Sequence, residues 1–236
     1  GAGRLLEPAL IVEAITEALG TGLLAGRHVV ITAGPTREPI CPVRYISNRS
    51  SGKMGYALAE ACVNAGAKTT LISGPVNCSA VDGVHFIPVE TTQEMHDASL
   101  LAAASADIFI GAAAVVDFKP ESVASQKIKR DGVAEMDLRL VPNPDIITAV
   151  SNGASRPSLV VGFAAETENV KEYALHKLTK KSLDYIFAND VSDASIGFDS
   201  DRNAGVLIGQ SGNIEMPIST KRVLAEAIIG ELSRHL

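Results

Sequence analysis

The chain has 236 residues, of which 46% are hydrophobic, and a formal net charge of −6. This length is sufficient for one α/β domain with a sizeable core. The negative charge argues against broad electrostatic binding to nucleic acid or to an anionic membrane. No apolar run reaches the length of a membrane span, and we expect no signal peptide before the domain. Cys41, Cys62 and Cys78 lie far apart without a CxxC motif, so we expect neither disulfides nor a zinc site. Free cysteines are typical of the reducing cytoplasm.

The first elements in chain order are a helix and a strand. An amphipathic helix is predicted from near Pro8 to Gly20, and an apolar, β-branched strand is predicted over residues 28–32. The strand breaks at Gly34-Pro35, and we expect residues 34–48 to form a structureless loop. A loop of that length is typically functional. Cys41 is expected to be a loop thiol, and we expect no catalytic role for it because no histidine is nearby in the sequence.

A short Gly/Ser turn, residues 50–55, follows this loop and opens a helix. A strand, a turn of small residues and a helix N-terminus together predict an anion site, because backbone N–H groups and the helix dipole point at the ligand. Ser50-x-Gly52-x-x-Gly55 is a relaxed dinucleotide fingerprint. It is not a Walker loop, because Met54 follows Gly52-Lys53. A plain strand-to-helix turn is the alternative interpretation.

The rest of the chain alternates between predicted strands and helices. Strands are expected at 68–73, 84–89, 107–113, 136–141, 158–163, 185–190, 204–209 and 214–218, and helices at 91–105, from 143, at 168–182 and at 219–236. This alternation favours a Rossmann-like three-layer α/β domain with a mainly parallel sheet. Ligands bind such sheets beyond the C-terminal strand ends, where Gly34, residues 111–114 and Asp117 fall.

Several charged residues are candidates for ligand binding, each with a plainer alternative. Residues 119–135 read as a mobile flap carrying a basic cluster, Lys127, Lys129 and Arg130, which could equally be a solvated charge run. Asp117 could accept from ribose or base groups, or could cap a turn. Lys177 and Lys181, four residues apart on one predicted helix, suggest a shared anion or are ordinary surface lysines.

The strongest signal is a series of six ordered sequence blocks. They read ITAGPTREPICPVRYISNRSSGKMG (31–55), FIGAAAVVDFKP (109–120), KIKR (127–130), NPDII (143–147), VGFAAET (161–167) and FANDVS (187–192). Together they resemble the phosphopantothenoylcysteine synthetase (phosphopantothenate–cysteine ligase) family, the ligase half of a bifunctional bacterial coenzyme A biosynthesis protein. By this resemblance residues 27–236 form the ligase domain. Residues 1–26 then form a linker helix after a flavin-dependent decarboxylase domain, to which FMN would belong.

The resemblance implies an activity and an assembly. The enzyme would join 4′-phosphopantothenate to the amino group of cysteine, with CTP as co-substrate and Mg²⁺, through an acyl-cytidylate. It would be a homodimer paired through a small antiparallel segment near the flap, and a larger oligomer in the full-length protein.

The resemblance also implies roles for individual residues. Catalysis would involve Lys127, Asn48 and Arg44, and the phosphopantothenate part would bind at Arg44, Asn48, Ala113 and Ala114. The nucleotide would bind at Ser50, Gly52, Gly111, Ala112, Ala113, Asp117, Lys127, Pro144, Asp145, Ile146, Ile147, Phe163, Lys177 and Lys181. Arg130 stands where the family pattern has a lysine, and the metal ligands stay unassigned.

Two other functions stay open at this point. Tyr173-x-x-x-Lys177 matches the catalytic pair of short-chain dehydrogenases, which would make the chain an NAD(P)-dependent oxidoreductase. A non-catalytic nucleotide-binding module would carry the same glycine turn. The five histidines form no ligand spacing and supply no evident catalytic base.

Overall fold

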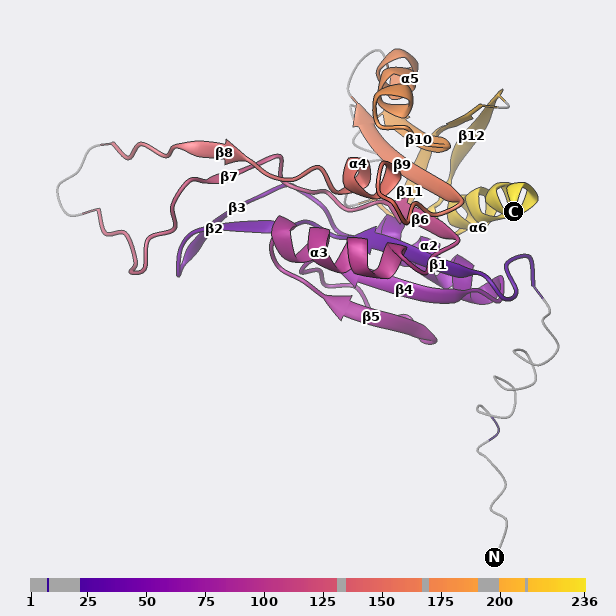
Figure 1. The fold of residues 1–236 in the computed structure, drawn as a ribbon, viewed down its shortest axis with the longest axis horizontal. Coiled ribbons are helices and arrows are strands. Elements are labelled where there is room, and N and C mark those ends of the chain that lie inside the picture. Colours follow the sequence, from indigo (N-terminus) through magenta and orange to yellow (C-terminus); the bar gives the residue numbers. More distant parts are fainter. Residues whose placement is uncertain (1–7, 9–21, 131–134, 167–169, 191–199, 211) are drawn as a thin grey trace, which may run out of the picture.

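The computed structural model describes residues 8, 22–130, 135–166, 170–190, 200–210 and 212–236. The helix predicted near the start of the chain lies outside the described residues, apart from Pro8. The other elements surround one central sheet, from which a long arm projects to one side (Figure 1).

The central sheet has eight strands in the order β12-β11-β10-β9-β6-β1-β4-β5. Six of them run parallel: β1 (His28–Ala33), β4 (Lys68–Ser73), β5 (Val84–Pro88), β6 (Ile108–Gly111), β9 (Leu159–Glu166) and β10 (Tyr185–Asp190). The last two, β11 (Arg202–Gly209) and β12 (Gly212–Thr220), form an antiparallel hairpin at one edge. The predicted mainly parallel sheet and its terminal hairpin are confirmed.

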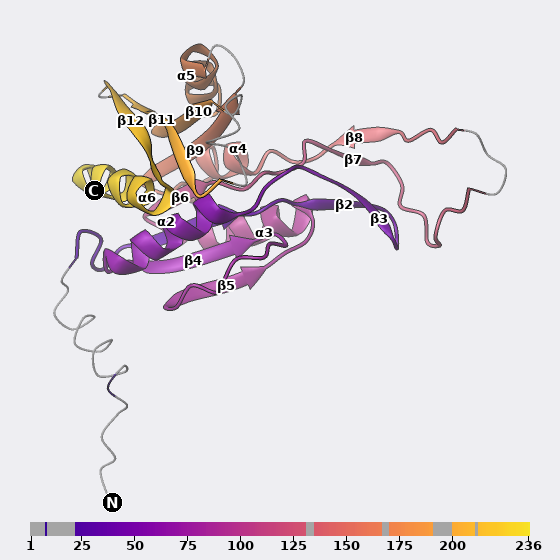
Figure 2. The ribbon, with the colours of Figure 1, turned by 180° about the vertical axis from the view of Figure 1, so that it is seen from behind.

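Helices cover both faces of this sheet, which gives the three layers (Figure 2). Along β1 successive side chains point to opposite faces. Val29 and Ile31 belong to the core shared with α2 (Lys53–Asn64) and α6 (Lys221–Leu232), whereas Val30 belongs to the opposite core. The opposite core is closed by α3 (Thr92–Ala103), α4 (Ile146–Ser151) and α5 (Val170–Lys180). A 3₁₀ turn, Ser233–His235, ends the chain.

The start of α3 shows how local sequence sets an element boundary. Thr91 accepts a hydrogen bond from the backbone N–H of Glu94, and the Glu94 carboxylate accepts from Thr91 N, so the predicted capping box is present. Hydrogen bonds from the backbone N–H groups of Glu90 and Thr91 hold the pKa of the Glu94 carboxyl below its ordinary value.

The prediction of a structureless loop over residues 34–48 is wrong. The segment contains an antiparallel pair, β2 (Arg37–Cys41) and β3 (Arg44–Ser47), joined by a tight turn at Pro42 and Val43. The prolines read as loop signals, but Pro42 suits a turn and Pro39 lies beside a register irregularity, where strands tolerate proline. Cys41 is thus the last residue of a strand, and its side chain is buried.

A second antiparallel pair lies beside the first. It joins β7 (Phe118–Pro120) to β8 (Leu140–Pro142), so the strand predicted over 136–141 is much shorter and stands outside the main sheet. We call residues 37–47, 118–130 and 135–142 the arm, which extends far from the body in Figures 1 and 2. Residues 121–130 of the expected flap have no regular secondary structure, and 131–134 lie outside the described residues.

Hydrogen bonds tie the flap side of the arm to the β2–β3 hairpin. Ala124 N donates to Ile40 O at 3.0 Å, and Arg44 Nη1 donates to Ile128 O at 2.8 Å. The backbone N–H of Ile128, followed by that of Val43, lowers the pKa of the Cys41 thiol to about 7 despite burial. The two strand pairs therefore form one unit.

Candidate active site

A polar cavity of about 570 Å³ opens at the C-terminal ends of the parallel strands. Thr32 of β1, Gly111 of β6, Phe163 of β9 and Asn189 of β10 all reach it, so it lies where open α/β sheets bind ligands. The start of α2, residues 111–117, the start of α4 and one face of α5 complete the wall.

The N-terminus of α2 points its positive dipole end at this cavity. Gly52 is the N-cap residue with φ of 77°, a conformation that favours glycine. Among the described residues no side chain caps this helix, and its first turn contains no acidic residue. One turn on, a Cβ atom on Gly55 would lie only 2.5 Å from Cβ of Ala33, so glycine lets α2 pack directly on β1. These features suit an anion.

Residues 112–117 form the irregular wall that follows β6. Ala112 N donates to Thr32 O at 3.2 Å, and Ala114 N donates to Gly34 O at 2.9 Å. Asn48, exposed at the rim, donates its amide N–H to Val115 O at 2.8 Å. The loop after β1 and the end of β3 therefore fix this wall from one side.

Two charged residues that line the cavity form an ion pair. Lys181 Nζ lies 2.9 Å from an Asp145 carboxylate oxygen, and Asp145 also caps α4 by accepting from Thr148 N. Partial burial raises the pKa of the Asp145 carboxyl, but hydrogen bonds from Lys181 and Thr148 outweigh it and leave that pKa below its ordinary value. Phe163 packs against Phe187 with ring centroids 5.3 Å apart, which steadies the cavity floor.

Most of the candidate site residues line this one cavity. These are Asn48, Ser50, Gly52, Gly111, Ala112, Ala113, Ala114, Asp117, Pro144, Asp145, Ile146, Ile147, Phe163, Lys177 and Lys181. Arg44 and Lys127 are not among the described lining residues; both are exposed on the arm. Tyr173 is also absent from the described lining, although Lys177, its partner in the dehydrogenase motif, is present.

The cavity has further polar lining residues that the sequence reasoning did not single out. Asn143 opens the NPDII block, so that block itself could have indicated it. Asn203 and Lys221 are buried, and they come from β11 and the start of α6, far along the chain. Only the packing of the hairpin and of α6 beside α2 brings them to the site, and no local pattern predicts that.

Within the described ranges, no group of three or more His, Cys, Asp or Glu side chains could hold a metal ion. Among the helices that the structure describes, none has both the length and the apolar character needed to cross a membrane.

Residues 24–236 match the family model described as "DNA/pantothenate metabolism flavoprotein C-terminal domain". The chain belongs to this family. The coenzyme A biosynthesis bifunctional protein CoaBC of Vibrio parahaemolyticus is 46% identical over 98% of the chain, and that of Bacillus subtilis is 43% identical over 99%. The chain spans only 58% of the length of each of these relatives.

A solved structure supports the same membership in this flavoprotein C-terminal domain family. The crystal structure of the C-terminal domain of a CoaBC protein is 36% identical and superposes with a TM-score of 0.77. The match covers 91% of this chain and 97% of that one. The fold described above is therefore that of this family.

Proposed function

We propose that the chain is a phosphopantothenate–cysteine ligase, which joins 4′-phosphopantothenate to cysteine at the expense of CTP in coenzyme A biosynthesis. One observation carries this proposal. In a chain that belongs to the family over residues 24–236, the N-terminus of α2 faces the same cavity as Asp117, Lys177 and Lys181. Such a site has donors for phosphates and both acceptors and donors for a nucleoside.

The reaction has two steps. A carboxylate oxygen of phosphopantothenate attacks the α-phosphorus of CTP, the α–β phosphoanhydride bond breaks, and pyrophosphate leaves. The amine nitrogen of cysteine then attacks the acyl carbon of the acyl-cytidylate, and CMP leaves as the amide forms. Because a carboxylate and a triphosphate repel each other, the site must supply cations and N–H dipoles.

We assign the nucleotide to the residues that share the cavity. Ser50 and Gly52, at the start of α2, hold phosphate oxygens. The nucleoside lies between residues 111–113, Asp117, the 144–147 turn and Phe163, with Lys177 and Lys181 reaching it from α5. The Lys181–Asp145 ion pair supports this assignment because it fixes Lys181, which directly follows α5, at the cavity wall.

Mg²⁺ would enter with the nucleotide and add positive charge to its phosphates. Such an ion needs only one or two carboxylates, because phosphates and water supply its other ligands. Asp117 fits this requirement, since it is an exposed carboxylate on the cavity wall, whereas Asp145 already pairs with Lys181.

The acyl end of the reaction involves the arm. We assign Asn48, Ala113 and Ala114 to the phosphopantothenate part, together with Arg44, and Lys127 to the α-phosphate. Arg44 and Lys127 stand on the arm, which projects from the body of its own chain (Figure 1).

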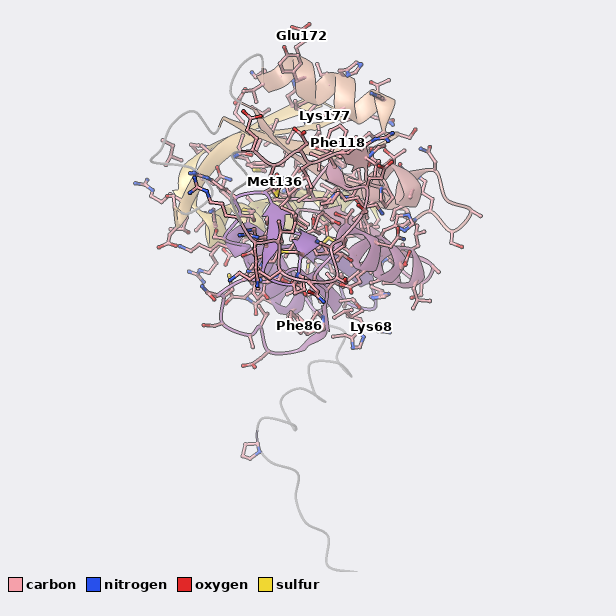
Figure 3. The ribbon with its side chains drawn as sticks, turned by 90° about the vertical axis from the view of Figure 1, so that its left-hand side faces the viewer. Lys68, Phe86, Phe118, Met136, Glu172 and Lys177 are labelled. Carbon is pink, nitrogen blue, oxygen red and sulfur yellow. The ribbon has the colours of Figure 1, made fainter. Side chains whose placement is uncertain are left out.

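We therefore propose a homodimer in which arms pair and complete the sites. Support comes from exposed apolar side chains on the arm: Val43, Tyr45, Phe118, Val123, Met136 and Leu140. Phe118 and Met136 are labelled in Figure 3. Exposed apolar side chains that gather on one surface mark interaction sites.

The proposal extends to the whole protein. Because the bifunctional relatives are longer than this chain, residues 1–26 would form the linker from an FMN-dependent decarboxylase domain, and the full-length protein would form a larger oligomer. The protein would act in the cytoplasm, where its three unpaired cysteines would stay reduced.

The choice of nucleotide is a direct test. We expect kcat/KM for CTP to exceed that for ATP, measured as pyrophosphate release with phosphopantothenate, cysteine and Mg²⁺ present. Equal values, or a preference for ATP, would overturn the assignment of CTP while leaving the ligase activity intact.

A further inference from the structure

A buried polar cluster lies behind the cavity wall. Thr36 and Thr92 have no exposed surface, and their hydroxyl oxygens are 3.0 Å apart. Asn143 donates one amide N–H to Thr92 Oγ1 at 3.2 Å and another to Val116 O at 2.9 Å. The backbone N–H of Val116 donates to Thr36 Oγ1 at 3.0 Å. We call Thr36, Thr92 and Asn143 the Thr–Asn clamp.

The clamp acts on the part of the cavity wall that is not held by the hydrogen bonds of a β-sheet. Residues 112–117 are irregular apart from one isolated bridge at Ala114. The clamp satisfies both backbone groups of Val116, and the backbone N–H of Asn143 donates to Asp117 O at 2.8 Å. Buried backbone groups need partners, so the clamp fixes the path of this segment at Val116 and Asp117.

The orientation of the Asn143 amide follows from its partners. Val116 O can only accept, so the Asn143 nitrogen must face it, and a flipped amide would set two oxygens against each other. The Asn143 Oδ1 atom is buried and has no partner among the described residues. The two N–H donations are therefore what this side chain contributes.

The clamp also connects the wall to the base of the arm. Glu38 of β2 is buried, and its carboxylate accepts the backbone N–H of Thr92 at 2.8 Å. Thr36 immediately precedes β2. The arm, the N-terminus of α3 and the cavity wall thus meet at one set of hydrogen bonds.

We propose that Thr36, Thr92 and Asn143 are positioning residues, which hold residues 113–117 in the geometry that binds the nucleotide. The proposal rests on the ligase function for the identity of that nucleotide. Thr36 and Thr92 are not among the described residues that line the cavity. Both must therefore act through Val116 and Asn143, which do line it. A wall fixed in advance lowers the entropy lost on binding, which is the physical benefit of the clamp.

Thr92 offers the sharpest test, because valine removes its hydroxyl with little change of shape. Losing one buried hydrogen-bond partner is expected to raise KM for CTP by about tenfold in Thr92→Val. KM for cysteine should stay at the wild-type value, since the clamp is assigned to the nucleotide wall. Thr92→Ser, which keeps the hydroxyl, should restore KM for CTP to nearly the wild-type value.

Ser99 supplies a matched control on the same helix. Its side chain is also fully buried in α3, but its Oγ atom has no partner among the described residues. Ser99→Ala should leave both KM values unchanged. An unchanged KM for CTP in Thr92→Val, even with a lower unfolding temperature, would show that the clamp is only structural and would overturn the proposal.

Hydrogen exchange tests the clamp without relying on activity. In Thr36→Val the Val116 amide loses its acceptor, so the peptide covering residues 112–117 should exchange faster than in the wild type, while that of β4 should not. Equal exchange would contradict the clamp. A wild-type chain that does not consume CTP would instead contradict the proposed ligase, and the exchange rates would then decide on the clamp alone.

Discussion

Asn48 makes one hydrogen bond that bears directly on the reaction. Its amide N–H donates to Val115 O at 2.8 Å, which places the side chain at the rim beside the proposed acyl site. Asn48→Asp keeps the size but sets a carboxylate against a carbonyl oxygen and adds charge near a phosphate-bearing intermediate. We expect the variant to form the acyl-cytidylate and convert it about 10²-fold more slowly, as losing one oriented donor would do.

Rapid quench followed by mass analysis would measure this effect. The intermediate should persist when cysteine is present. Asn152→Asp is a suitable control, because Asn152 also donates to a carbonyl oxygen, Thr148 O at 3.2 Å, but is not among the described lining residues. Normal turnover of Asn48→Asp would contradict this role and would show that Asn48 only stabilises the local backbone.

At the residue scale, the sequence predicted residues that line the cavity wherever their position follows from the local pattern. Such residues lie near a strand end or a helix start, and the hydrophobic and glycine pattern of the sequence predicts both positions. Examples are Ser50, Gly52 and Asp117. Asn203 and Lys221 were not predicted, because their place in the cavity depends on packing between elements far apart along the chain.

At the element scale, the close packing of α2 on β1 depends on the absence of a side chain at Gly55. A Cβ on Gly55 would lie 2.5 Å from Ala33 Cβ and 3.1 Å from Ala33 Cα, closer than carbon atoms pack. We expect Gly55→Ala to lower the free energy of unfolding by about 1–3 kcal/mol, the usual cost of overpacking.

Gly230 provides the matched control for this prediction. It also lies inside a helix, α6, but nothing stands within 4 Å of the position of its Cβ. Gly230→Ala should raise the free energy of unfolding by up to about 1 kcal/mol, because alanine favours helix over glycine. Urea unfolding would compare the two variants, and equal effects would mean that contact with Ala33 does not limit α2.

Most elements of the body were predictable, because their hydrophobic periodicity agrees with their final burial. The arm was not, since β2 and β3 are short, contain prolines and lie outside the main sheet. Their pairing depends on the turn at Pro42 and on contacts with the flap, neither of which has a periodic signal.

At the scale of the whole molecule, the position of the arm predicts sites shared between two chains. Arg44→Ala changes the arm and Asp117→Asn changes the cavity of the body, so each variant alone should be inactive. Mixed dimers would contain one site in which both parts are intact. Random mixing of equal amounts should therefore restore about a quarter of the wild-type activity in a symmetric dimer.

The control mixture combines Asp117→Asn with Lys177→Ala. Both positions line the cavity of one body, so no mixed dimer contains an intact site, and activity should stay absent. If the first mixture also stays inactive although native mass spectrometry detects mixed dimers, each chain completes its own site.

The proposed reaction of this chain joins phosphopantothenate to cysteine with a nucleotide as the energy source. The most direct measurement is mass analysis of the products formed from CTP, phosphopantothenate, cysteine and Mg²⁺, with each component omitted in turn. We predict that phosphopantothenoylcysteine, CMP and pyrophosphate appear in equal amounts, and that without cysteine only the acyl-cytidylate and pyrophosphate form. Absence of phosphopantothenoylcysteine from the complete mixture, with folded protein confirmed by its unfolding transition, would contradict the claim.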